Sequence, residues 1–172
     1  MRVLASLLVI QDWPQLLGPD RNLTYQGPWS EKSSFSQLWT KPVGEGFASP
    51  VVAQGRLLVF YRQNNREILD SLDPATGKQQ WSAGYPTGYR DDFGFSEGPR
   101  ATPTVDGDLV FTYGAEGTLQ CTNLKSGAKV WQLDARKEFG VRKEFFPSPL
   151  GCAGRLAWQQ LRPRALLLTA SV

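Results

Sequence analysis

The chain has 172 residues, 41% of them hydrophobic, which is enough for one domain with a buried core. It contains no histidine, which excludes the commonest general base, triads that need histidine and most zinc sites. The formal charge of +3 comes from the arginines after Gly154, so the preceding residues lack the basic surface that a nucleic-acid partner requires.

The first ten residues, MRVLASLLVI, place an early arginine before an apolar run from Val3 to Ile10. This pattern is typical of the short end of a secretory leader, although no A-x-A-like cleavage site follows it. We therefore expect residues 1–11 to be a truncated export leader and the protein to be periplasmic or extracellular; the alternative is a misplaced start or an uncleaved apolar N-terminus. The run is far shorter than the roughly 20 residues that cross a bilayer, so no transmembrane span is expected.

Seventeen glycines, twelve prolines and six tryptophans favour an all-β chain of short strands and tight turns. A repeated unit supports this, because three segments align without gaps: SPVVAQGRLLVF (49–60), TPTVDGDLVFTY (102–113) and SPLGCAGRLAWQ (148–159). Each begins with Ser-Pro or Thr-Pro and continues with a strand-like run. A residue followed by glycine then separates this run from a second one. The pattern predicts hairpin turns at Gln54-Gly55, Asp106-Gly107 and Ala153-Gly154.

The second half of the unit repeats as well, with SLDPATGKQQW (71–81) aligned on CTNLKSGAKVW (121–131). In both copies an Asp or Asn stands four residues before a glycine. This spacing suits a turn in which the Asx side chain bonds the backbone and the glycine adopts a left-handed conformation. The strand after each turn is expected to end near a tryptophan.

Trp39, in FSQLWTKPVG, stands at the same place before the first Ser-Pro, and the tryptophans recur at about 40 to 50 residues, as do four-stranded propeller blades. We expect Trp39, Trp81 and Trp131 to close blades together with Gly77 and Gly127, each indole as a flat plate stacked on the glycine-rich turn of its neighbour. The alternative is that these are ordinary core aromatics and that the repeated hairpin is a coincidence.

The paired segments SPVVAQGRLLVF…LDSLDPATGKQQW and TPTVDGDLVFTY…LQCTNLKSGAKVW resemble the pyrroloquinoline-quinone-type (PQQ-like) propeller repeat over residues 39–156. This resemblance implies an all-β fold, a partial β-propeller of four-stranded antiparallel blades. DWPQLLGPDRN (12–22) resembles the arm that precedes the propeller in exported bacterial members, so residues 12–38 are expected to form an irregular N-terminal arm.

The resemblance ends after Leu156, where the chain has no glycine, Asx turn or closing tryptophan. We expect residues 157–172 to be an aberrant tail and the chain to be a fragment of an incomplete ring. A frameshift, a truncated gene or a spliced fragment would each explain such an ending.

The longest insertion between the repeats, residues 82–101, carries a candidate loop site at Asp91, Asp92 and Arg100. The two aspartates are candidates for cation ligands or an acid/base pair, and Arg100 for an anion contact. The alternative is that these are solvated loop charges, because adjacent residues seldom face one site and the spacing fits no calcium loop.

Members of this repeat class include quinone-dependent dehydrogenases and envelope assembly scaffolds, so the fold alone does not select a function. The dehydrogenases usually add a vicinal disulfide, calcium ligands and a catalytic Asp. Here Cys121 and Cys152 are far apart and are either buried thiols or a disulfide.

We therefore expect a non-catalytic binding or scaffold module of an exported, bacterial protein, with no catalytic, cofactor or metal residues of its own. Its partner would be another protein or the missing blades. The alternative is a fragment of a PQQ-dependent dehydrogenase, with PQQ and calcium bound only in the complete parent protein.

Overall fold

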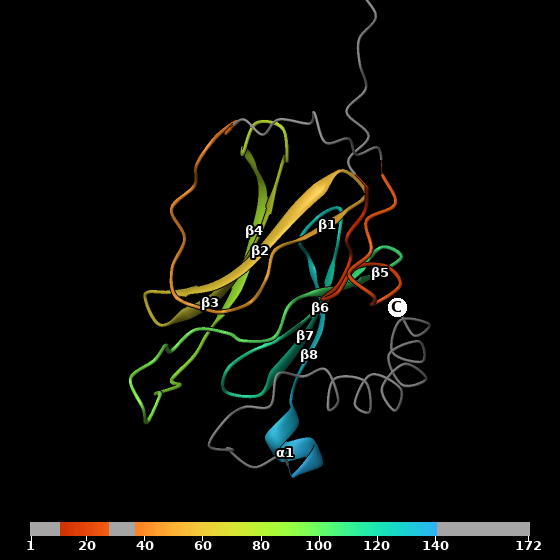
Figure 1. Ribbon diagram of the computed structural model, residues 1–172. Coiled ribbons are helices and arrows are strands. Elements are labelled where there is room, and N and C mark those ends of the chain that lie inside the picture. The colour runs from red at the N-terminus through yellow and green to blue at the C-terminus, as the bar shows by residue number, and fades with distance from the viewer. Residues whose placement is uncertain (1–10, 28–36, 141–172) are drawn as a thin grey trace, which may run out of the picture.

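The computed structural model of the chain describes residues 11–27 and 37–140 (Figure 1). Four features expected from the sequence lie wholly or partly outside these residues. They are the leader, the middle of the arm, the third repeat copy at 148–159 with Cys152, and the tail at 157–172.

The described residues form two four-stranded antiparallel sheets, each with its strands in chain order. The first sheet, called blade 1, contains β1 (Val51–Ala53), β2 (Arg56–Gln63), β3 (Arg66–Leu72) and β4 (Gln79–Pro86). The second sheet, blade 2, contains β5 (Thr104–Asp106), β6 (Leu109–Tyr113), β7 (Thr118–Asn123) and β8 (Lys129–Asp134). The expected fold class is confirmed: the sheets are propeller blades, and they do not close into a ring.

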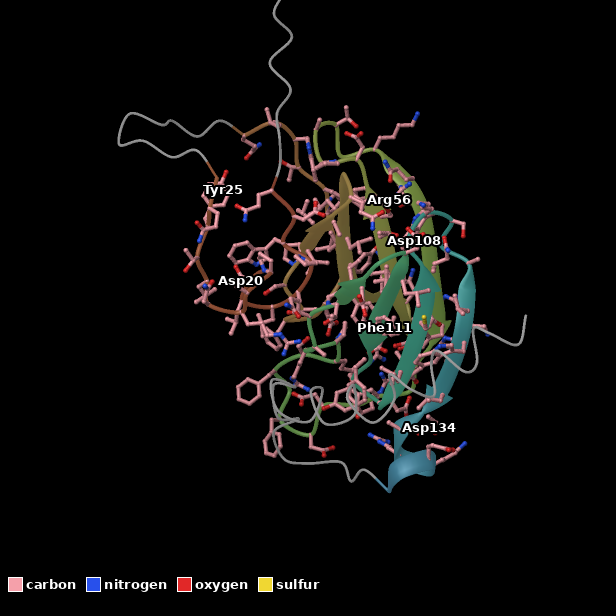
Figure 2. All side chains as sticks on the ribbon, turned by 90° about the vertical axis from the view of Figure 1, so that its right-hand side faces the viewer. Asp20, Tyr25, Arg56, Asp108, Phe111 and Asp134 are labelled. Carbon is pink, nitrogen blue, oxygen red and sulfur yellow. The ribbon has the colours of Figure 1, made fainter. Side chains whose placement is uncertain are left out.

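A short helix, α1 (Ala135–Phe139), follows β8 and was not expected from the sequence. The Asp134 carboxylate, labelled in Figure 2, caps it by accepting hydrogen bonds from the backbone N–H groups of Arg136 and Lys137. Gly140 ends it with a φ of 64°.

Each blade has a hairpin between its first and second strands. The hairpin turn of blade 1 is at the predicted residues, and the turn of blade 2 is shifted by one residue. In blade 1 Ala53 pairs with Arg56, so Gln54 and Gly55 form the turn, with φ of 49° and 70°. In blade 2 Asp106 pairs with Leu109, so the turn is Gly107-Asp108 and the prediction of Asp106-Gly107 was wrong. The strand register is equivalent in the two blades, and the glycine occupies the first turn position instead of the second.

The Asx turns between the third and fourth strands are the same in both blades. Asp73 Oδ1 accepts hydrogen bonds from the N–H groups of Ala75 and Thr76, and Asn123 Oδ1 accepts the equivalent bonds from Lys125 and Ser126. Both turns close on a glycine with positive φ. The local sequence therefore builds one turn twice.

The hydrophobic core lies between the two blades. It joins one face of blade 1 to the Val110 side of blade 2, and its buried members are Val51, Leu58, Phe60, Leu69, Tyr85, Val110 and Leu124. Cross-strand partners share a face of a sheet, so the pairing of Val51 with Leu58 and of Phe60 with Leu69 puts these side chains on one side of blade 1. The blades hold together by burying this face, whereas each sheet alone would leave it in water.

Candidate functional site

Trp39 lies against the Asx turn of blade 1. Its indole Nε1 donates a hydrogen bond to Pro74 O at 3.0 Å. Gly77, with a φ of +71°, lies so close to the ring that an added Cβ would stand 2.6 Å from Trp39 Cδ2. Only glycine fits there, because a side chain would meet the indole and the backbone is left-handed.

Trp81 repeats this arrangement between the blades. Its Nε1 donates to Leu124 O at 2.9 Å, and a Cβ added to Gly127 would stand 2.7 Å from Trp81 Cδ2. The φ of Gly127, +73°, matches that of Gly77. The structure therefore brings each of these tryptophans to the glycine turn of the unit that follows it in the chain.

Trp131 occupies the equivalent place in blade 2. It pairs with Cys121 as Trp81 pairs with Ser71, so it lies on the face of blade 2 that points away from blade 1. Its ring contacts Phe111 at a centroid distance of 6.1 Å. Its Nε1 is buried and has no hydrogen-bond partner among the described residues, whereas the indoles of Trp39 and Trp81 each donate to a backbone carbonyl.

We call the surface around Trp131 the outer blade face. Strand pairing places its members on one side of the sheet: Thr104, Phe111, Tyr113, Leu119, Cys121, Trp131 and Leu133. The equivalent residues of blade 1 include Val51, Leu58, Phe60 and Leu69, which blade 2 covers. Cys121 is a free, buried thiol, and burial raises its pKa to about 12, so it is not a nucleophile at neutral pH.

A buried carboxyl group also connects the two blades. Glu67 on β3 is fully buried, and its Oε1 accepts a hydrogen bond from Ala115 N at 2.7 Å across the interface. Its Oε2 and the hydroxyl of Tyr85 both lie beside Gly114, where an added Cβ would overlap Glu67 Oε2. Burial raises the pKa of Glu67, although hydrogen bonds from the Ala115 N–H and from Tyr85, and the charge of Arg62, oppose the shift. Neither group has an exposed position from which to reach a substrate.

Arg62 organises the long loop between the blades and was missed by the sequence analysis. Its guanidinium, which is buried, donates from Nη1 to Tyr89 O at 2.7 Å and to Glu97 O at 2.9 Å. Nη2 donates to Asn65 Oδ1 and lies 3.2 Å from Glu97 Oε2. Its position in the strand could have indicated this role. Arg62 continues the alternation of inward-facing residues on β2, and a charged side chain at a buried position needs partners.

The structure brings two of the three expected loop residues together. Arg100 Nη2 lies 3.2 Å from Asp91 Oδ1, Nη1 donates to the Tyr89 hydroxyl, and the guanidinium stands over the Phe47 ring at 5.9 Å. Partial burial raises the pKa of Asp91, but hydrogen bonds from Phe95 N–H and Arg100 outweigh it, and the net pKa lies below the ordinary value. Asp92 is exposed. The ion pair thus holds the loop in place, and the charges of Asp91 and Arg100 neutralise each other.

Residues 11–27 and 37–140 contain no cluster of three or more carboxylate, cysteine or histidine side chains that could hold a metal ion. The same residues contain no helix with the length and apolar character needed to cross a membrane.

A family profile described as outer membrane protein assembly factor BamB, of the PQQ-like repeat type, matches residues 65–151. No curated protein matches the chain. The crystal structure of BamB from Moraxella catarrhalis is 23% identical with a TM-score of 0.33, over 52% of this chain and 23% of that chain.

Two quinohemoprotein alcohol dehydrogenases are similar at the same level. ADHIIG from Pseudomonas putida HK5 is 22% identical, and the enzyme from Comamonas testosteroni is 21% identical. Each has a TM-score of 0.35, over 49% of this chain and 12% of that chain. The chain therefore spans less than a quarter of the length of each of these three proteins.

Proposed function

This chain belongs to the PQQ-like β-propeller repeat family of outer membrane protein assembly factor BamB, and from this we propose that it is a non-catalytic binding or scaffold module. Its outer blade face docks another protein surface, supplied by further blades or by a partner. The protein acts after export, in the periplasm or outside the cell, as its apolar N-terminal run suggests.

Trp131 carries this proposal. A buried indole N–H without an acceptor costs free energy, and two equivalent indoles in the chain meet that need with a carbonyl of the next Asx turn. The outer blade face has aromatic and aliphatic side chains at the positions that blade 2 covers on blade 1. A protein surface with a carbonyl beside a glycine turn would accept the hydrogen bond from the N–H and would cover the apolar side chains.

The proposal is tested by sedimentation velocity of the full chain over a range of concentrations. We expect self-association, because the unpaired Trp131 N–H and the outer strand edges favour contacts between copies. Trp131→Ala should weaken the association at least tenfold. Val130→Ala, on the neighbouring and exposed position of β8, is the matched control and should leave the association unchanged. A wild-type chain that stays monomeric at every concentration, with a cooperative melt, would contradict the proposal.

We further propose that the chain neither binds PQQ nor oxidises alcohols with it, even with calcium. Cofactor chemistry requires the protein to hold the reactive carbon against a substrate and a base, and this needs residues from several blades. The test is a titration of PQQ with calcium, followed by absorbance, and a dye-linked alcohol oxidation assay. Saturable micromolar binding with turnover above a heat-treated control would favour the alternative, a fragment of a PQQ-dependent dehydrogenase.

A further inference from the structure

The N-terminal arm lies along the first strand of both blades. Trp13 N donates to Val52 O at 2.7 Å, and Val52 N donates back to Trp13 O at 3.0 Å, so the two residues form an antiparallel bridge. The next residue reaches the other blade, because Val105 N donates to Pro14 O at 2.8 Å. Figure 1 shows this red segment beside β1 and β5.

Asp12 adds a side-chain contact to the same edge. Both of its carboxylate oxygens accept a hydrogen bond from Gln54 N at 3.1 Å. One tripeptide, Asp12–Pro14, therefore satisfies three edge N–H groups, those of Val52, Gln54 and Val105, on two different sheets. We call this surface the axial edge, since the first strands of propeller blades line the central channel.

The residue types suit an extended peptide bound at an edge. Pro14 contributes a carbonyl and carries no N–H, so it presents no unpaired donor, and it holds Trp13 in extended backbone. The Trp13 ring turns back on the arm itself, because a Cβ added to Gly18 would stand 2.8 Å from Trp13 Cη2. Recognition at the axial edge thus depends on main-chain groups and one carboxylate, the chemistry of peptide addition to a sheet edge.

We propose that the axial edge is a binding site for an extended Asp-x-Pro peptide and that the arm occupies it within the same chain. An unpaired sheet edge is a template for another strand. The arm meets it through a short row of hydrogen bonds, whereas other hydrogen bonds of residues 11–27, such as Gly18 N to Gln15 O, lie within the arm. A peptide of the same pattern from another protein would make the same contacts and displace the arm.

Amide hydrogen exchange of the full chain, read residue by residue by NMR, tests the site. Asp12→Ala should lower the protection of Val52, Gln54 and Val105 together, by at least tenfold, and leave Leu69 in β3 unchanged. Asp20→Ala is the matched control, since Asp20 lies on the outer loop of the same arm (Figure 2) and should have no effect. Loss at Gln54 alone, with Val105 still protected, would overturn the idea of one site across two blades.

Binding of a separate peptide is the second arm of the experiment. A synthetic peptide of residues 11–27, added to the Asp12→Ala chain, should restore protection of the three amides with saturation, and the same peptide carrying Asp12→Ala should not. If the Asp12→Ala chain fails to fold, Asp12→Asn, which keeps one acceptor oxygen, serves in its place. No restoration by the wild-type peptide at millimolar concentration would overturn the proposal. These readouts do not involve Trp131, so they succeed or fail independently of the proposed function.

Discussion

The two blades share one repeat but differ in how their faces are covered. Blade 1 buries one face against blade 2, and on its other side the buried Asp70 accepts from the Tyr61 hydroxyl and pairs with Lys41 at 3.3 Å. Blade 2 buries its Val110 side, while its outer blade face carries Trp131 without a hydrogen-bond partner among the described residues. The same local sequence thus builds both sheets, and the neighbouring blade decides how much each contributes to stability.

The strands show the same difference. β2, β3 and β4 have 8, 7 and 8 residues, whereas β6, β7 and β8 have 5, 6 and 6. The Asx turns, in contrast, agree bond for bond. Turn geometry therefore depends on local residues, and strand length and burial depend on the surroundings.

The largest expected effect comes from the tryptophans. Trp81→Ala should lower the free energy of unfolding by about 3 to 5 kcal/mol, because it removes a large, partly buried ring that packs against the core and leaves Leu124 O unpaired. Trp131→Ala should cost about 1 kcal/mol, since its indole makes no such bond. Urea unfolding followed by far-UV circular dichroism measures both. Equal costs would show that the blades do not differ as described.

Trp39→Ala belongs in the same series. The sequence predicts a smaller cost than for Trp81, because the repeat resemblance begins only at Trp39. The structure gives Trp39 the same contacts with a glycine turn and a carbonyl, so we expect its cost to fall between those of Trp81 and Trp131. A cost equal to that of Trp81 would mean that the indole contact alone sets the stability.

The next effect separates backbone strain from the indole contact. Gly127→Ala and Gly55→Ala place a side chain at nearly the same φ, +73° and +70°, but only Gly127 has a ring against it. Gly55→Ala should cost about 1 to 2 kcal/mol from left-handed backbone. Gly127→Ala should cost roughly 2 kcal/mol more, because the Trp81 ring must move. Equal thermal shifts in calorimetry would contradict close packing between the blades.

Glu67 makes the interface between the blades sensitive to pH. Its pKa is raised in the folded protein, so the folded state holds its proton more tightly than the unfolded state. This contribution to stability is complete below the unfolded pKa of about 4.5 and is lost as pH rises through the raised folded pKa. Glu67→Gln should remove this loss, so the variant gains stability relative to wild type as pH rises, by at most about 1.4 kcal/mol per pH unit.

Glu138→Gln on α1 is the control for the pH series, because Glu138 is exposed. Unfolding in urea at several pH values from 4 to 8 measures both variants. Parallel stability curves for wild type and Glu67→Gln would show that Glu67 keeps an ordinary pKa despite its burial between the blades.

The smallest effect concerns the first residue of the Asx turns, which is Asp73 in blade 1 and Asn123 in blade 2. Hydrogen bonds from the Thr76 hydroxyl and backbone N–H lower the pKa of Asp73, whereas Asn123 does not titrate. The contribution of Asp73 is therefore present above its unfolded pKa of 3.8 and is lost as pH falls through the lower folded value. Asp73→Asn should make the blade 1 turn insensitive to acid. Melting curves between pH 2 and 5 that remain identical to wild type would contradict this.

The sequence alone determined the repeated unit, the two Asx turns and the residues that the turns use. These features are local, since Asp73 and Asn123 bond N–H groups two and three residues away, and glycine is the residue that adopts their positive φ. The spacing of the tryptophans was also sufficient to predict four-stranded blades, because one large ring per blade recurs with the period of the fold.

Tertiary structure decided the remaining features. Glu67 meets Ala115, 48 residues later in the chain, and Arg62 holds a loop whose carbonyls come from Tyr89 and Glu97. The arm joins Val52 to Val105, and the pairing of Asp106 with Leu109 set the second hairpin turn. Such contacts depend on which backbone groups two folded sheets present to each other, and a one-residue choice in a turn is settled by the register of the strands rather than by the turn residues themselves.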